Sequence, residues 1–95
     1  MPDDAGAGDE ARSVGEATAF LAERGVPPTA REFRLRQEFF RHGWDVRVRD
    51  EGGTWTVRAV KPDRPDAAAV GATEGAALRL ALAAALSADE ATGAP

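Results

Sequence analysis

The chain has 95 residues, of which 43% are hydrophobic and 29% are charged, and its formal net charge is −4. This composition is typical of one small globular domain and argues against a wholly disordered chain. The lack of cysteine excludes disulfide bonds, thiol nucleophiles and thiolate metal sites. No apolar run approaches the roughly 18 residues of a membrane span, and the acidic start lacks the layout of a secretory signal. We therefore expect a cytoplasmic protein without a membrane partner.

The charges are unevenly distributed along the chain. Residues 31–64 contain nine basic and six acidic residues, whereas the remainder contains three basic and ten acidic residues. A basic middle segment is the electrostatic pattern of an anion-binding face, but it also describes a solvated surface. Eleven of the twelve basic residues are arginine and alanine is abundant, so composition alone explains much of the pattern. We favour the solvated surface.

The N-terminal part of the chain predicts two helices. Residues 1–12 are mostly glycine, alanine and acidic residues without periodicity, and we expect a flexible acidic arm there. The sequence "SVGE" at 13–16 has the spacing of a capping box and predicts a helix over about 14–24. After "VPP", the second capping-box spacing, "TARE" at 29–32, predicts a helix over about 30–42.

The second predicted helix carries two apolar stripes. Phe33 and Phe40 share one face with Gln37, whereas Leu35 and Phe39 share another. A helix with two such stripes is held from more than one side or leaves one stripe free for a partner. We expect Leu35 and Phe39 to form the free stripe and to contact another protein.

The segment "GWDVRVRDEGGTWTVRAV" at 43–60 predicts a β-hairpin, because apolar and polar residues alternate on both sides of two glycines. One face of the hairpin carries the apolar set, namely Trp44, Val46, Val48, Trp55, Val57 and Ala59. The other face carries Arg47, Arg49 and Arg58. Antiparallel sheets with this alternation bury one face and expose the other. We therefore expect the indoles in the core and the guanidinium groups in solvent.

The C-terminal part predicts one long helix that covers the sheet. The sequence "AAAV" at 67–70 is a weak candidate for a third strand, because alanine is a poor strand former. Thr73 begins a helix over about 74–87, in which Ala77, Leu78, Ala81, Leu82 and Ala85 form one apolar stripe. Residues 88–95 are expected to form a flexible tail. The predicted fold is α+β, with two N-terminal helices, a small antiparallel sheet of two or three strands, and a C-terminal helix packed on one sheet face. Residues 13–87 would form the single domain.

Residues that carry catalytic or metal chemistry are scarce. The only histidine is His42, beside the glycine that ends the second predicted helix, where the helix dipole favours a solvent-facing imidazole. The sequence contains neither a phosphate-binding loop nor calcium-loop spacing. We therefore expect a protein that is not an enzyme and that uses no metal or other cofactor.

Short motifs between residues 52 and 78 resemble the N-terminal module of HicB-type antitoxins. They are Gly52-Gly53 and Trp55, then Pro62-Asp63-Arg64-Pro65, Gly71-Ala72-Thr73 and Ala77-Leu78. The resemblance covers at most residues 44–87. It implies a β-β-β-α module that binds and blocks a small ribonuclease toxin. This sequence differs from the family in its two preceding helices and in the alanines that follow "G-A-T".

Two functional hypotheses follow from these patterns. The first is a non-catalytic module that binds another protein or forms a homodimer, through a sheet edge or through Leu35 and Phe39. The alternative is a nucleic-acid-binding protein that uses Arg47, Arg49 and Arg58, with Arg34 and Arg41 as candidate additional contacts. A third hypothesis, an enzyme based on His42 and a carboxylate, has the least support.

Overall fold

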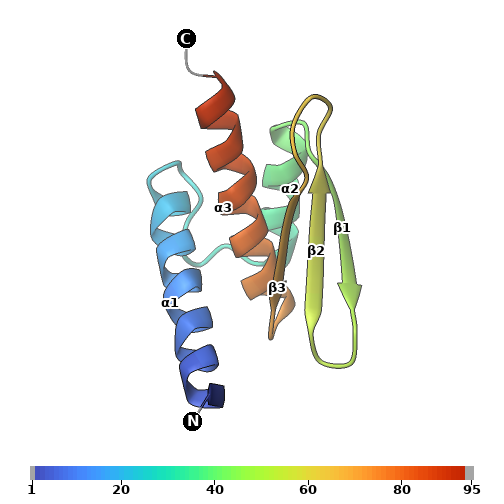
Figure 1. Ribbon diagram of the computed structural model, residues 1–95. Helices are drawn as coiled ribbons and strands as arrows, with labels where there is room; N and C mark the ends of the chain where they lie inside the picture. Colours follow the sequence, from blue (N-terminus) through green and yellow to red (C-terminus); the bar gives the residue numbers. More distant parts are fainter. Residues whose placement is uncertain (1, 94–95) are drawn as a thin grey trace.

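The computed structural model describes the backbone of residues 2–93 and the side chains of residues 9–92. The described residues form three helices and three strands in the order α1 (Pro2–Ala22), α2 (Glu32–Arg41), β1 (Asp45–Asp50), β2 (Trp55–Val60), β3 (Ala67–Gly71) and α3 (Glu74–Gly93). The strands form one antiparallel sheet in the order β1-β2-β3. This architecture confirms the predicted α+β fold and resolves the number of strands as three (Figure 1).

The helices gather on one face of the sheet. α3 packs across β2 and β3, and α2 fits against both α3 and β1. α1 runs along α3 on the side away from the sheet (Figure 1). The opposite sheet face carries no helix in the described part of the chain, so one face of the sheet is covered and the other is open.

The strand register confirms the predicted separation of apolar and basic side chains. Val46 lies opposite Ala59 and Val48 opposite Val57, on the face that α3 covers. Arg47 lies opposite Arg58 on the other face. Gly52 and Gly53 join β1 to β2 with φ values of 67° and 92°, a backbone region that glycine enters without steric strain.

The core forms where α3 meets the sheet and α2. Six α3 residues form one buried stripe: Ala77, Leu78, Ala81, Leu82, Ala85 and Leu86. The Trp44 indole is 1% exposed beside this stripe, and Trp55 is half-buried against it. Each fully buried leucine contributes about 1.5–3 kcal/mol, so contact with α3 stabilises both the hairpin and α2.

The third strand forms from alanines because small side chains suit its position under α3. Ala67 is buried and Ala69 is half-buried against the core. Gly71 lies so close to the start of α3 that an added Cβ atom would be 2.8 Å from the backbone nitrogen of Ala77. Poor strand propensity is overridden here by pairing with β2 and by close helix packing.

Both predicted capping boxes are wrong. α1 begins at Pro2, so Ser13 lies inside the helix. α2 begins two residues later than predicted, and its N-cap is Arg31, which makes no side-chain capping hydrogen bond. The chain turns first, because the Ala30 amide donates to the Pro27 carbonyl at 3.0 Å. A capping-box spacing therefore identified segments that form helices, but not the residues at which they begin.

The first and third helices are longer than predicted. α1 includes residues 2–12 of the expected arm, and α3 continues through residues 88–93 of the expected tail. No proline interrupts residues 74–93, and alanine is the best helix former. Residue 1 and residues 94–95 lie outside the described residues. The flexibility of the arm and of the tail stays a prediction.

Candidate interaction surfaces

The open sheet face carries Arg47, Arg49 and Arg58, as the alternation predicted. Their side chains are 80%, 77% and 67% exposed. The three arginines line a hollow of about 500 Å³, together with Thr56 and Glu51. Trp44 and Trp55 pack on the other side of the sheet, so neither indole is available for base stacking beside these arginines.

Each arginine of this face lies near a carboxylate. Arg58 donates to Asp66, with nitrogen–oxygen distances of 2.7 and 2.9 Å. Arg47 lies 3.8 Å from Asp45, and Arg49 lies 3.7 Å from Glu51. The face is therefore rich in guanidinium donors but close to neutral in charge, which weakens its attraction for a polyanion.

Leu35 and Phe39 do not form the predicted contact surface. Both side chains are 0% exposed, because this stripe of α2 faces α3 and the sheet. The outward stripe is the other one, on which Phe33 is 74% exposed and Phe40 is 59% exposed. Periodicity showed two stripes, but only the tertiary packing decides which of them is buried.

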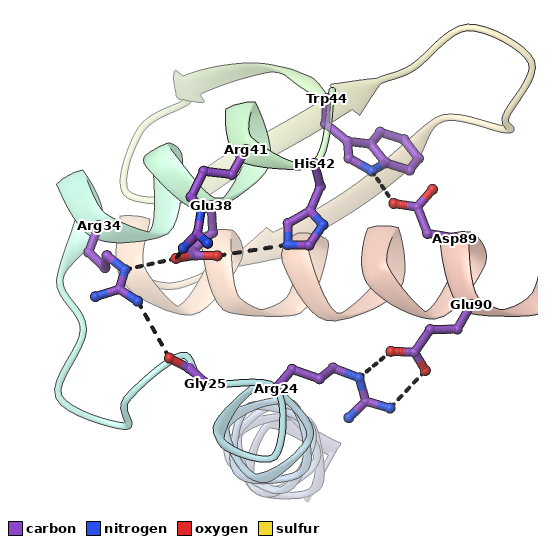
Figure 2. Close-up of polar contacts among 9 residues, drawn as sticks. All are labelled: Arg24, Gly25, Arg34, Glu38, Arg41, His42, Trp44, Asp89 and Glu90. Atoms are coloured by element: carbon purple, nitrogen blue, oxygen red, sulfur yellow. Dashed lines mark hydrogen bonds and ion pairs between the residues drawn. The ribbon is translucent and has the colours of Figure 1, made fainter. Parts of the chain in front are cut away.

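Beside the exposed phenylalanines, one buried carboxylate holds two arginines. The Glu38 side chain is 4% exposed, and its Oε2 accepts from Arg34 Nε at 2.9 Å and from Arg41 at 3.0 Å. Arg34 also donates to the carbonyl of Gly25 at 3.4 Å, while His42 Nε2 lies 3.8 Å from Glu38 Oε1 (Figure 2). A buried acid needs such partners.

This arrangement was not predicted, although the sequence contains a signal for it. Arginines four residues before and three residues after Glu38, with a histidine four residues after it, all lie within reach on a helix. The structure adds a hollow of about 620 Å³, lined by Arg34, Gln37, Glu38, Phe40 and Arg41. Chemically, the hollow offers guanidinium donors next to an exposed phenyl ring. Such a site suits an anionic group attached to an apolar one.

A half-buried polar cluster joins the end of α3 to the loop after β2. Asp89 Oδ2 accepts from Trp44 Nε1 at 3.0 Å (Figure 2), and Oδ1 accepts from Lys61 at 3.0 Å and from Arg64 at 3.3 Å. Desolvation alone would raise the pKa of Asp89, but the hydrogen bonds from Trp44, Lys61 and Arg64 outweigh it and the pKa lies below its ordinary value. This cluster supports the fold and leaves few donors for a ligand.

The lowered pKa of Asp89 predicts a loss of stability in acid. The charged carboxylate binds its partners only in the folded state, so its contribution is complete above the unfolded pKa of about 3.9 and is lost as the pH falls through the lower folded value. We expect Asp89→Asn to reduce the free energy of unfolding by about 1–3 kcal/mol at neutral pH. The difference from wild type should shrink as the pH falls below 4, measured by urea unfolding followed by tryptophan fluorescence.

The matched control for Asp89→Asn is a substitution of the neighbouring carboxylate, Glu90. Glu90 also has a lowered pKa, caused first by its hydrogen bond from Arg24, but the pair lies at the surface. Solvent screens exposed ion pairs, so Glu90→Gln is expected to change stability less than Asp89→Asn. Equal effects of the two substitutions, or a difference that does not vary with pH, would contradict the role assigned to Asp89.

The described part of the chain shows neither a metal centre nor a membrane-spanning helix. Among residues 9–92, whose side chains the structure describes, no group of three or more histidines or carboxylates is placed to hold a metal ion. None of the three described helices combines the length and apolar composition that a membrane span needs. His42 lies at the C-cap of α2, as predicted, with Glu38 as its acidic neighbour.

Comparisons with known proteins identify no relative of this chain. No family model, no curated protein and no solved structure matches it. A proposal for its function therefore rests on the surfaces described above.

Proposed function

We propose that the protein is a small, non-catalytic, cytoplasmic module that binds another protein or a second copy of itself through the outer face of α2. The exposure of Phe33 and Phe40 on one helix face is the observation that supports this proposal. Covering a phenylalanine side chain contributes about 1.5–3 kcal/mol. Aromatic residues and arginine are enriched at protein interfaces, and this face carries both.

An antitoxin-like role is part of this proposal. The element order β1-β2-β3-α3 is the order that the resemblance to HicB-type modules implies, and it supports the comparison. α2 lies before the segment that carries the resemblance, so the proposed contact face is an addition to that module. A small toxin protein is the kind of partner that the resemblance implies.

Nucleic-acid binding through Arg47, Arg49 and Arg58 is the second candidate function. Arg47 and Arg58 lie directly opposite each other, a pairing of like charges that destabilises a sheet. In the described part of the chain, Arg47 and Arg49 also make no side-chain hydrogen bond. Free donors on an open face favour an anion. The nearby Asp45, Glu51 and Asp66 carboxylates favour the protein-binding proposal instead.

Site-specific photo-crosslinking tests the leading proposal. A photoreactive residue in place of Gln37, between the two exposed phenylalanines, is expected to give one discrete protein adduct in cells. The adduct should be lost when Phe33→Ser and Phe40→Ser are added. The same photoreactive residue in place of Thr54, in the β1–β2 connection, serves as the control. No adduct from position 37, or an adduct that persists in the serine variant, would contradict the proposal.

Labelled single- and double-stranded oligonucleotides separate the two functions. If the sheet face binds nucleic acid, affinity falls steeply with salt as phosphate contacts release counterions. It also falls in an Arg47→Gln, Arg49→Gln variant. The leading proposal predicts no binding that depends on these two residues.

A further inference from the structure

We infer that the partner of the outer α2 face is an acidic amphipathic segment of a different protein, one of whose carboxylates enters between Arg34 and Arg41. This inference rests on the proposed function and specifies its partner. Three observations lead to it: the fixed position of the two guanidinium groups, the local charge, and the spacing of the exposed phenylalanines.

Glu38 fixes the two guanidinium groups without exhausting their donors. Its Oε2 accepts one hydrogen bond from each arginine. A guanidinium has five N–H groups, and the only other acceptor that either arginine meets in the described residues is the Gly25 carbonyl. The Arg34 and Arg41 side chains are 40% and 69% exposed, whereas Glu38 is covered. Their free donors therefore face solvent in fixed positions, which lowers the entropy lost when an anion binds.

The charge of α2 is opposite to that of the rest of the molecule. Residues 31–42 contain four arginines and two glutamates, a net charge of +2 within a chain of net charge −4. One of the two glutamates is Glu38, which is buried. An acidic partner is therefore attracted to α2 although the chain as a whole is acidic, so electrostatics helps to orient the encounter.

A second copy of the chain is a poorer occupant of this face. A two-fold dimer places the same patch of both subunits face to face. The Arg34 and Arg41 side chains would then meet the same arginines of the partner copy, and like charges brought together across an interface are unfavourable. An acidic segment avoids this repulsion and uses the same two phenylalanines.

The spacing of the two exposed phenylalanines fits a helical partner segment of two turns or more, or an extended segment of the same length. Phe33 and Phe40 are seven residues apart, about 10 Å along a helix, with Gln37 between them. Apolar anchors at such spacing are the recognition pattern of an amphipathic helix laid against an apolar face. Leucines of the partner would cover the phenyl rings while a flanking glutamate or aspartate reaches the arginines.

Two fluorescein-labelled synthetic amphipathic peptides of equal length test the inference. Both carry leucine on one face, and the other face is glutamate in the first and lysine in the second. By fluorescence anisotropy, we expect the acidic peptide to bind at least about tenfold more tightly at low salt, and to weaken as salt screens the charges. Light scattering is expected to give the 10.0 kDa monomer mass at high protein concentration.

The variants are chosen so that the fold is preserved. Removing both arginines alone would leave Glu38 buried without the two groups that donate hydrogen bonds to it, so the test variant is Arg34→Gln, Glu38→Gln, Arg41→Gln. It should lose about tenfold in affinity for the acidic peptide and keep the circular dichroism spectrum of wild type. Arg47→Gln, Arg49→Gln on the sheet removes the same number of arginines and should bind as wild type does.

The outcomes distinguish this inference from the proposed function. A dimer that Phe40→Ser dissociates would overturn the inference and support binding through α2. Binding of the lysine peptide with the same affinity as the acidic peptide would also overturn the inference and support binding through α2. A monomer that binds neither peptide and gives no adduct from position 37 would overturn both. If a labelled oligonucleotide binds wild type but not the triple variant, the ligand of the outer α2 face is nucleic acid and not an acidic protein segment.

Discussion

Replacing Phe39 with alanine is expected to lower the free energy of unfolding by about 3–5 kcal/mol, whereas Phe40→Ala should change it by less than about 0.5 kcal/mol. The two residues are adjacent in α2, have the same side chain and differ only in the side of the helix they occupy. Phe39 is 0% exposed and Phe40 is 59% exposed. The pair therefore tests directly which stripe of α2 is core and which is surface.

The expected loss is large compared with the stability of a chain of this size. Small domains unfold with a free energy of about 5–15 kcal/mol, so Phe39→Ala removes a substantial part of it. The phenyl ring belongs to the cluster in which α2 meets Trp44 and the leucines of α3. Its removal leaves a cavity that the surrounding backbone fills only in part.

Chemical unfolding followed by circular dichroism measures both variants, and the photo-crosslink at position 37 measures the binding that we propose for α2. Phe40→Ala is expected to unfold with the wild-type midpoint and to give less adduct. Equal midpoints for the two variants, or a larger loss for Phe40→Ala, would mean that α2 is rotated relative to the arrangement described above.

The parts of the fold that the sequence predicted are those set by short-range pattern. Strict alternation in residues 43–60 defined both faces of the hairpin, because a strand repeats every two residues. The leucine and alanine stripe of α3 defined its buried side in the same way. Neither prediction required knowledge of a distant residue.

The parts that the sequence did not predict depend on contacts between distant segments. Asp89 lies in the segment expected to be a tail, and it accepts a hydrogen bond from Trp44, which is 45 positions earlier in the chain. A buried tryptophan needs an acceptor for its N–H, but the pattern alone does not say which acid supplies it. The choice between the two stripes of α2 has the same origin, since it depends on where α3 packs.

Gly71→Ala is expected to destabilise the protein by about 1–3 kcal/mol or more. An alanine Cβ at this position would lie 2.8 Å from the backbone nitrogen of Ala77, 3.2 Å from its Cα atom and 3.2 Å from the Cβ atom of Ala76. Two of these three atoms belong to the backbone of α3 and cannot yield by a change of rotamer. β3 and α3 would have to separate at the point where the strand leads into the helix.

The sign of the effect distinguishes this contact from ordinary glycine behaviour. Replacing glycine by alanine inside a strand or helix normally stabilises, by roughly 0.5–1 kcal/mol, so without the contact Gly71→Ala would raise the unfolding midpoint. Gly15→Ala is the control, because Gly15 lies in α1 with nothing within 4 Å of the added atom. We expect urea unfolding to give a higher midpoint for Gly15→Ala and a lower one for Gly71→Ala. Stabilisation by both substitutions would show that α3 does not pack against the end of β3 as closely as described, and the alanine strand would then lack the packing that explains it.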